Sequence, residues 1–191
     1  MINPNTLCKL VQILDNYNIT CGVGGSYLLQ LYDLYDEPED VDFWISPSDV
    51  PKVKKIFNEY EEITEKLQLP QEYHFKIIFN DIKVDFVACF IVKPNKNEYR
   101  YNISPDNVTR LCLEDGNQLP CTSLEDWYIV YKLLKRDDKA DIIEEYIKPM
   151  FGNRVLEATL GNKDNKLPPK VTKSINEAMW KNSQMQLKLY A

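Results

Sequence analysis

The sequence contains one histidine in 191 residues, and its five cysteines are scattered, with no Cys-x-x-Cys pair among them. Zinc sites are built from clustered Cys and His ligands, so the sequence does not predict a zinc site. With His74 as the only histidine, a Ser–His hydrolase is poorly supported as well. An odd number of scattered cysteines is instead typical of reduced, mostly buried thiols in a cytosolic protein.

The N-terminal segment lacks the basic residues and the apolar run of a secretory signal. No stretch of the chain is long and apolar enough to predict a transmembrane helix. We therefore expect a cytoplasmic protein with no membrane partner. Two nucleotide-binding motifs are also missing, because the glycines at 22–25 do not form a dinucleotide fingerprint and no Walker Lys-Ser/Thr pattern follows them.

Basic residues are in deficit, with 23 Lys and Arg against 29 Asp and Glu and a net charge of −6. The chain thus lacks the overall basic footprint of nucleic-acid-binding proteins, although a local basic patch can still bind nucleic acid. The acidic balance either favours a cationic acceptor molecule or simply serves solubility.

In the N-terminal part of the chain, segments with a strand-like pattern alternate with segments with a helix-like pattern, as in an α/β fold. A capping box at Ser123–Asp126 predicts that a further helix begins just after Ser123. The expected elements are helix 5–17, strand 19–23, helix 27–35, strand 40–45, helix 48–60, hairpin 73–90 with its turn at 80–81, hairpin 108–121, and helices 124–135, 139–147, 154–160 and 172–189.

The stretch 20–46 carries the residues with the clearest chemistry. Gly24 and Gly25 predict a turn in which the backbone needs freedom, and Ser26 can cap the helix that follows. Such a glycine turn offers backbone N–H groups to phosphate. Asp40 and Asp42 lie two residues apart on a predicted strand, so their side chains point to the same side, with Cα atoms about 6.5 Å apart. Paired carboxylates are the hard oxygen ligands that Mg²⁺ prefers.

Asp85 lies in the middle of an otherwise apolar predicted strand. A carboxylate in that position is costly to bury unless it has a partner. The partner is either a metal ion, with Asp85 acting beside the two earlier aspartates, or a neighbouring lysine in a purely structural salt bridge.

The order Gly-Gly-Ser, one helix, Asp-x-Asp and a later aspartate resembles the signature of the DNA polymerase β-like nucleotidyltransferase superfamily. The resemblance covers Cys21 to about Ile147 and is to the small bacterial members, among them antibiotic and toxin-type nucleotidyltransferases. It implies an α+β fold, in which a small mixed sheet flanked by helices is followed by a helical part. We place a catalytic domain at 1–122 and a C-terminal helical region at 123–191.

The resemblance also implies an activity of the EC 2.7.7 type: transfer of a nucleoside monophosphate from a nucleoside triphosphate, ATP among them, to an acceptor hydroxyl. Pyrophosphate would be released, and Mg²⁺ or Mn²⁺ would be required. The implied site residues are Gly25, Ser26, Lys132 and Lys135 for the nucleotide, and Asp40, Asp42 and Asp85 for metal binding and catalysis. Asp85 would be a metal ligand, the general base or both.

The helical tail leaves alternatives open. Lys132 best matches the family's triphosphate-contacting lysine and Lys135 is second, but both could be ordinary solvated lysines. Asp141 is expected to pair with a Lys or Arg. The last helix either closes the acceptor site or supports a homodimer. The acceptor is a small molecule such as an antibiotic, a tRNA or a protein hydroxyl, and a non-catalytic nucleotide- or partner-binding module is the rival hypothesis.

Overall fold

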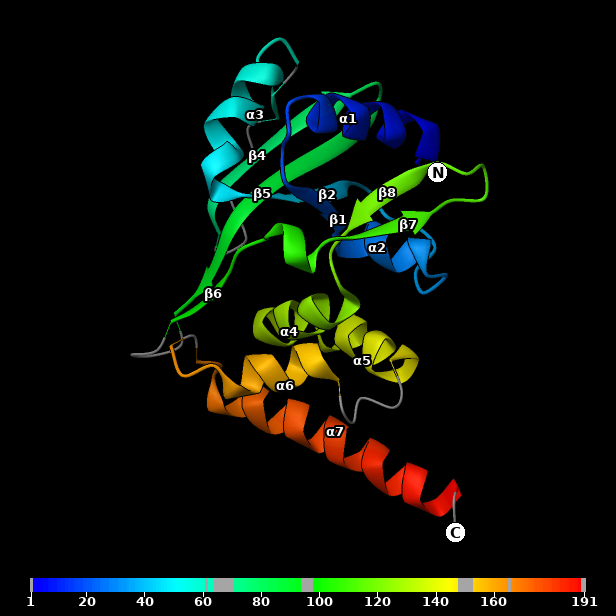
Figure 1. Cartoon of the computed structure of the whole chain (residues 1–191), viewed down its shortest axis with the longest axis vertical. Coiled ribbons are helices and arrows are strands. Elements are labelled where there is room, and N and C mark those ends of the chain that lie inside the picture. The colour runs from blue at the N-terminus through cyan, green and yellow to red at the C-terminus, as the bar shows by residue number, and fades with distance from the viewer. Residues whose placement is uncertain are drawn as a thin grey trace. The chain divides into compact units, whose positions relative to one another are not determined.

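The computed structural model describes two compact units of the chain, formed by residues 1–91 with 101–123 and by residues 92–100 with 124–191. It describes residues 2–60, 62–63, 71–93, 98–147, 153–164 and 166–189, and of residues 62–63, 71–72 and 180–189 the backbone alone. Figure 1 labels the helices and, except for β3, the strands.

The first unit is built on a mixed β-sheet flanked by helices (Figure 1). Its helices are α1 (Pro4–Asn16), α2 (Gly25–Leu31) and α3 (Val50–Ile56), with short 3₁₀ turns at Pro47–Asp49 and Pro105–Asn107. Its strands are β1 (Cys21–Gly24), β2 (Val41–Ile45), β3 (Glu62–Ile63), β4 (Gln71–Phe79), β5 (Ile82–Val92), β7 (Thr109–Cys112) and β8 (Gln118–Cys121). Strand β6 (Tyr99–Tyr101) lies at a boundary of the two units, with Tyr99 and Arg100 assigned to the second. This architecture confirms the predicted α+β class.

The strand order within the described residues is β3-β4-β5-β2-β1-β8-β7, and β6 pairs with β5. The pairs β2–β5 and β1–β8 are parallel, whereas β1–β2, β3–β4, β4–β5 and β7–β8 are antiparallel. Both predicted hairpins are confirmed. The turn between β4 and β5 has positive φ at Asn80 and Asp81, 46° and 67°, as a two-residue type I′ hairpin turn requires.

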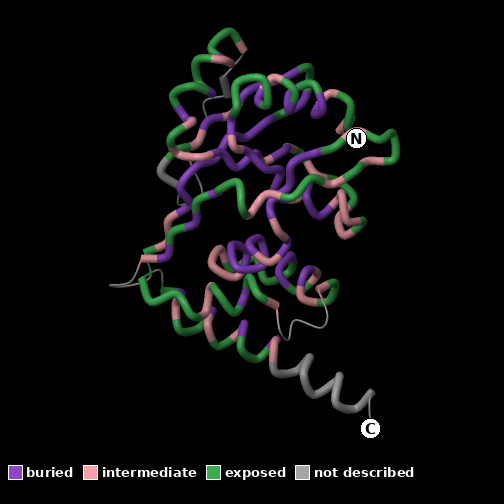
Figure 2. The backbone as a smooth tube through the Cα atoms, viewed as in Figure 1, coloured by how far each residue is buried: buried purple, intermediate pink, exposed green. Residues whose placement is uncertain are grey.

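The core of this unit covers both faces of the sheet: Trp44 and Val87 are buried on the face that carries Asp42 and Asp85, and an aromatic cluster is buried on the opposite face. Phe86 of β5 stacks on Phe57, which follows α3, with ring centroids 5.3 Å apart, and on Phe75 of β4 at 5.0 Å. These side chains are nearly fully buried, as is the apolar stripe of α1 (Leu7, Leu10, Val11 and Leu14). Burying one such side chain contributes about 1.5–3 kcal/mol. Figure 2 shows the central strands as largely buried.

The second unit is helical, with α4 (Leu124–Leu134), α5 (Asp137–Tyr146), α6 (Arg154–Gly161) and α7 (Pro169–Leu189). Helix α4 begins directly after Ser123, as its capping box predicts, and packs against α5, α6 and α7. Trp127 and Tyr131 of α4 are buried, with ring centroids 5.2 Å apart. No helix in the described part of the chain is both long and apolar enough to cross a membrane.

Several predicted boundaries around the central motif were wrong. Helix α2 begins at Gly25 with Gly24 as its N-cap, so Ser26 lies inside the helix and does not cap it. The positive φ of Gly25 turns the chain from strand into helix within one residue, which leaves no room for a separate capping residue. The helix ends at Leu31, and β2 begins at Val41, so Asp40 lies just before the strand.

Candidate active site

Asp42 and Asp85 are direct neighbours in the sheet. Strands β2 and β5 run parallel with Asp42 paired to Asp85, so both carboxylates project from the same face. The alternate residues of β2, Val41 and Phe43, are fully buried on the opposite, apolar face. Asp40 precedes Asp42 by two residues, just before the strand. Aspartates predicted from different parts of the sequence therefore meet at one place.

A lysine and a histidine from β4 contact these carboxylates. Lys76 pairs with Asp85 across the β4–β5 hairpin, and its Nζ lies 2.8 Å from Asp85 Oδ2 and 3.5 Å from Asp40 Oδ2. His74 Nε2 lies 3.1 Å from the same Asp85 Oδ2. The side chains of Lys76 and His74 are only 16% and 9% exposed. The mostly buried ammonium group of Lys76 thus contacts both Asp40 and Asp85.

Gly25 brings the glycine turn against this cluster. Its φ is +62°, and a Cβ added there would lie 1.7 Å from Asp42 Oδ2 and 2.8 Å from Asp42 Cγ. The Asp42 carboxylate therefore lies directly over the Gly25 backbone, and only glycine leaves room for it. Ser26 follows as the second residue of α2 and is half-buried.

The carboxylate groups of the site are suited to binding a cation. Asp85 Oδ1 is buried and has no hydrogen-bond partner, and a buried acceptor without a partner costs about 1–3 kcal/mol. Burial and the negative charge of Asp85 raise the pKa of Asp40, whereas Lys76 lowers it. The net rise shows that burial and the charge of Asp85 together outweigh the effect of Lys76 on Asp40.

A divalent ion can use such carboxylates even where no protein cage exists. Among the described residues, no three Cys, His, Asp or Glu side chains form a ready-made metal site. Mg²⁺ is commonly held by one or two carboxylates together with water and substrate phosphates, so the donor set around Asp85 Oδ1 is chemically suitable for it.

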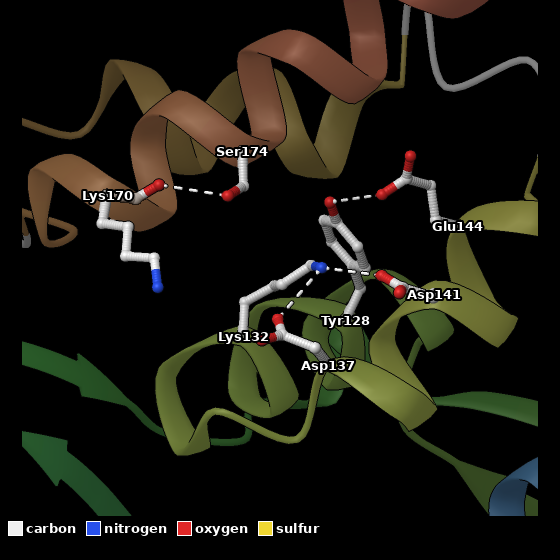
Figure 3. Close-up of polar contacts among 7 residues, drawn as sticks. All are labelled: Tyr128, Lys132, Asp137, Asp141, Glu144, Lys170 and Ser174. Carbon is white, nitrogen blue, oxygen red and sulfur yellow. Dashed lines mark hydrogen bonds and ion pairs between the residues drawn. The ribbon is translucent and has the colours of Figure 1, made fainter.

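Lys132 belongs to the second unit, where it is held by two aspartates (Figure 3). Its Nζ lies 2.8 Å from Asp141 Oδ1 and 3.2 Å from Asp137 Oδ1, and it lies over the Tyr128 ring at 5.7 Å. Burial alone would lower the pKa of Lys132, but the hydrogen bonds to Asp141 and Asp137 outweigh burial and raise it. The expected pairing of Asp141 with a lysine is confirmed.

The surroundings of Lys132 are acidic. It lines a cavity of about 320 Å³ whose other lining residues are Asp141, Glu144, Glu145, Ser174, Glu177 and Ala178. A triphosphate would have to replace the aspartates as partners of Lys132, so the nucleotide contact of this lysine stays a prediction. Lys135 is exposed directly after α4, with φ of 60°, and its nucleotide contact also stays a prediction.

Sequence reasoning missed Lys76 and His74 as parts of the site. A usable signal was present, because a two-residue turn at Asn80-Asp81 pairs Phe79 with Ile82 and thereby places Lys76 opposite Asp85. The alternative of a salt bridge between Asp85 and a neighbouring lysine was foreseen, and that salt bridge is present.

No protein-family model and no curated protein sequence matches the chain. Solved structures do match. The Thermotoga maritima protein TM1012, assigned as a nucleotidyltransferase, superposes with a TM-score of 0.55 and 21% identity, over 77% of this chain and 95% of that one. The chain has a nucleotidyltransferase-type fold.

Two antibiotic-modifying enzymes share this nucleotidyltransferase-type fold. The lincosamide adenylyltransferase LnuA matches with a TM-score of 0.53 and 11% identity, covering 75% of this chain and 97% of its own. The antibiotic-resistance factor ANT(2'')-Ia matches with a TM-score of 0.55 and 10% identity, covering 97% of this chain and 95% of its own. The predicted resemblance to small nucleotidyltransferases is therefore confirmed at the level of the fold.

Proposed function

We propose that the protein is a nucleotidyltransferase that moves a nucleoside monophosphate from a nucleoside triphosphate to an acceptor hydroxyl and releases pyrophosphate. The observation that carries the proposal is the in-register pairing of Asp42 with Asp85, with Asp40 joined to Asp85 through Lys76. On a nucleotidyltransferase-type fold, this cluster has the charge needed to hold a metal–triphosphate complex.

Each residue of the cluster has a proposed role. Asp40, Asp42 and Asp85 would hold Mg²⁺, which supplies Lewis-acid stabilisation of the charge that develops on the phosphate oxygens. Asp85 Oδ1, the oxygen without a partner, is either a ligand or the acceptor of the proton from the attacking hydroxyl. Gly25 and Ser26 would contact the β and γ phosphates. Lys132 would add a cation, with Lys135 as the second candidate.

The donor and the acceptor are proposed from charge and from the related folds. LnuA is an adenylyltransferase whose structure contains lincomycin, and ANT(2'')-Ia has been solved with adenylylated tobramycin. A small antibiotic-like acceptor and ATP as donor are therefore the first candidates, and the net charge of −6 favours a cationic acceptor. A tRNA or protein hydroxyl is the alternative acceptor.

The test measures binding and turnover separately. Calorimetry with ATP, GTP, CTP and UTP in the presence of Mg²⁺ identifies the donor, and pyrophosphate release with lincosamides, aminoglycosides and total tRNA identifies the acceptor. Asp42→Asn should reduce turnover on the order of 100-fold, because it removes one preorganised charge at the phosphates. Asp106→Asn removes an exposed aspartate and should leave turnover unchanged.

Two results would contradict this function. A folded Asp42→Asn variant with turnover near that of the unaltered protein would show that the cluster is not catalytic. Tight nucleotide binding with no pyrophosphate release for any acceptor would favour the rival hypothesis of a non-catalytic nucleotide-binding module.

A further inference from the structure

Lys76 is a mostly buried lysine whose ammonium group lies between two carboxylates. It contacts Asp85 Oδ2 at 2.8 Å and Asp40 Oδ2 at 3.5 Å, and its side chain is 16% exposed. A buried ammonium group persists only when it is paired, because its desolvation is costly. Lys76 thus depends on these carboxylates, and it supplies them in turn with a compensating positive charge.

The compensation is incomplete. Three aspartates gather here, and Lys76 contacts two of them, Asp40 and Asp85. Asp85 Oδ1 is buried without a hydrogen-bond partner. A divalent cation carries twice the charge of an ammonium group and would satisfy this oxygen as well.

Both cations need the carboxylate groups of Asp40 and Asp85. Mg²⁺ binds oxygen at about 2.0–2.1 Å, and two positive charges a few ångströms apart in a buried site repel strongly. We infer that Lys76 is an internal counter-ion that competes with the divalent cation for Asp40 and Asp85 and thereby sets the affinity of the site for metal. This inference rests on the proposed function, because it takes the cluster to be a metal site.

The carboxylate arrangement agrees with this competition. In the described part of the chain, no three acidic, cysteine or histidine side chains converge closely enough for a metal ion, and two of the carboxylates instead face one ammonium group. The four-carbon stem of a lysine is flexible, so the ammonium group can withdraw when metal arrives. His74 contacts Asp85 through the same Oδ2 and can keep that carboxylate oriented after Lys76 leaves.

The test uses divalent cation alone, without nucleotide. Mn²⁺ binding is measured by calorimetry and by electron paramagnetic resonance for the unaltered protein, for Lys76→Met and for Lys83→Met. Met keeps the length of the lysine stem without its charge. Lys83 is an exposed lysine on β5, two residues from Asp85, and therefore controls for the general loss of one positive charge.

Lys76→Met should bind Mn²⁺ at least tenfold more tightly than the unaltered protein, whereas Lys83→Met should change affinity by less than twofold. Without metal, Lys76→Met should melt at a lower temperature, and Mg²⁺ should raise its melting temperature more than that of the unaltered protein. Lys76→Arg keeps the charge and should bind Mn²⁺ no more tightly than the unaltered protein. If Lys76→Met does not fold, Lys76→Gln serves in its place.

If a folded Lys76→Met or Lys76→Gln variant binds Mn²⁺ as tightly as the unaltered protein or more weakly, the inference is overturned. Lys76 would then either have no effect on metal affinity or help to form the metal site. Absence of Mn²⁺ binding in every variant would overturn it as well. Pyrophosphate release by the unaltered protein distinguishes failure of this inference from failure of the proposed function. If release depends on Mg²⁺ while Lys76→Met shows no gain in Mn²⁺ affinity, the inference fails and the proposed function stands.

Discussion

Gly25 lets the Asp42 carboxylate lie against the backbone at the point where strand becomes helix. Two constraints act there, because φ is +62° and because a Cβ would meet Asp42 Oδ2 at 1.7 Å. The first constraint concerns the backbone alone, and an L-residue with positive φ costs roughly 1–2 kcal/mol. The second concerns the position of a proposed metal ligand, so it bears on the chemistry of the site.

Gly25→Ala should therefore lower the free energy of unfolding by about 1–3 kcal/mol and displace the Asp42 carboxylate. Gly116→Ala is the matched control, because Gly116 also has positive φ, +82°, but an added Cβ would meet nothing within 4 Å. Urea unfolding and Mn²⁺ binding measured on both variants separate backbone strain from collision. Equal losses in both properties for the two variants would show that the contact with Asp42 has no consequence.

At the scale of secondary-structure elements, the β4–β5 hairpin sets the position of Lys76 against Asp85. Asn80 and Asp81 both have positive φ, a conformation that glycine adopts at lower cost than aspartate. Asp81→Gly should raise the free energy of unfolding by up to about 1 kcal/mol, and Asp81→Ala should lower it by a similar amount. Urea denaturation midpoints check both; a drop in stability for Asp81→Gly would contradict the turn assignment.

The hairpin also shows how far the sequence alone could lead. Alternation of apolar residues and a two-residue turn predict β4, β5 and, by register, the contact of Lys76 with Asp85. The parallel pairing that joins Asp42 to Asp85 leaves no such local signal, because strands separated by a long connection can pair in several orders. The grouping of the three aspartates in one site was therefore predictable only from the family motif. The contacts of Lys76 and His74 with these aspartates were not recognised from the sequence.

At the scale of the whole molecule, buried thiols make the fold sensitive to alkaline pH. Four of the five cysteines are buried, as predicted, and Cys112 is exposed. Mainly because of burial, the pKa of the Cys21 and Cys121 thiols rises from 9.0 to about 12. Burial likewise raises the pKa of Tyr27 from 10.0 to about 12. In each case the unfolded chain ionises at lower pH than the folded one.

A raised acid pKa contributes stability that is fully present below the unfolded value and is lost as pH rises through the folded value. Between pH 8 and pH 10 the two thiols should together reduce the free energy of unfolding by about 3 kcal/mol. Urea unfolding at each pH measures this loss, with Cys21→Ala/Cys121→Ala as control. A pH slope that is unchanged in the double variant would show that these thiols do not cause it.

The placement of β1 between β2 and β8 has a consequence for biosynthesis. All three proposed carboxylate ligands have been translated once the ribosome reaches Asp85. One edge of β1 nevertheless stays without its partner strand until Cys121 and Thr122 of the β8 segment have been synthesised. In the folded protein, Thr122 donates its backbone N–H to Val23 O at 3.0 Å. A bare edge invites pairing with other chains. The nascent polypeptide thus carries a complete set of acidic ligands before it can shield the strand beside them.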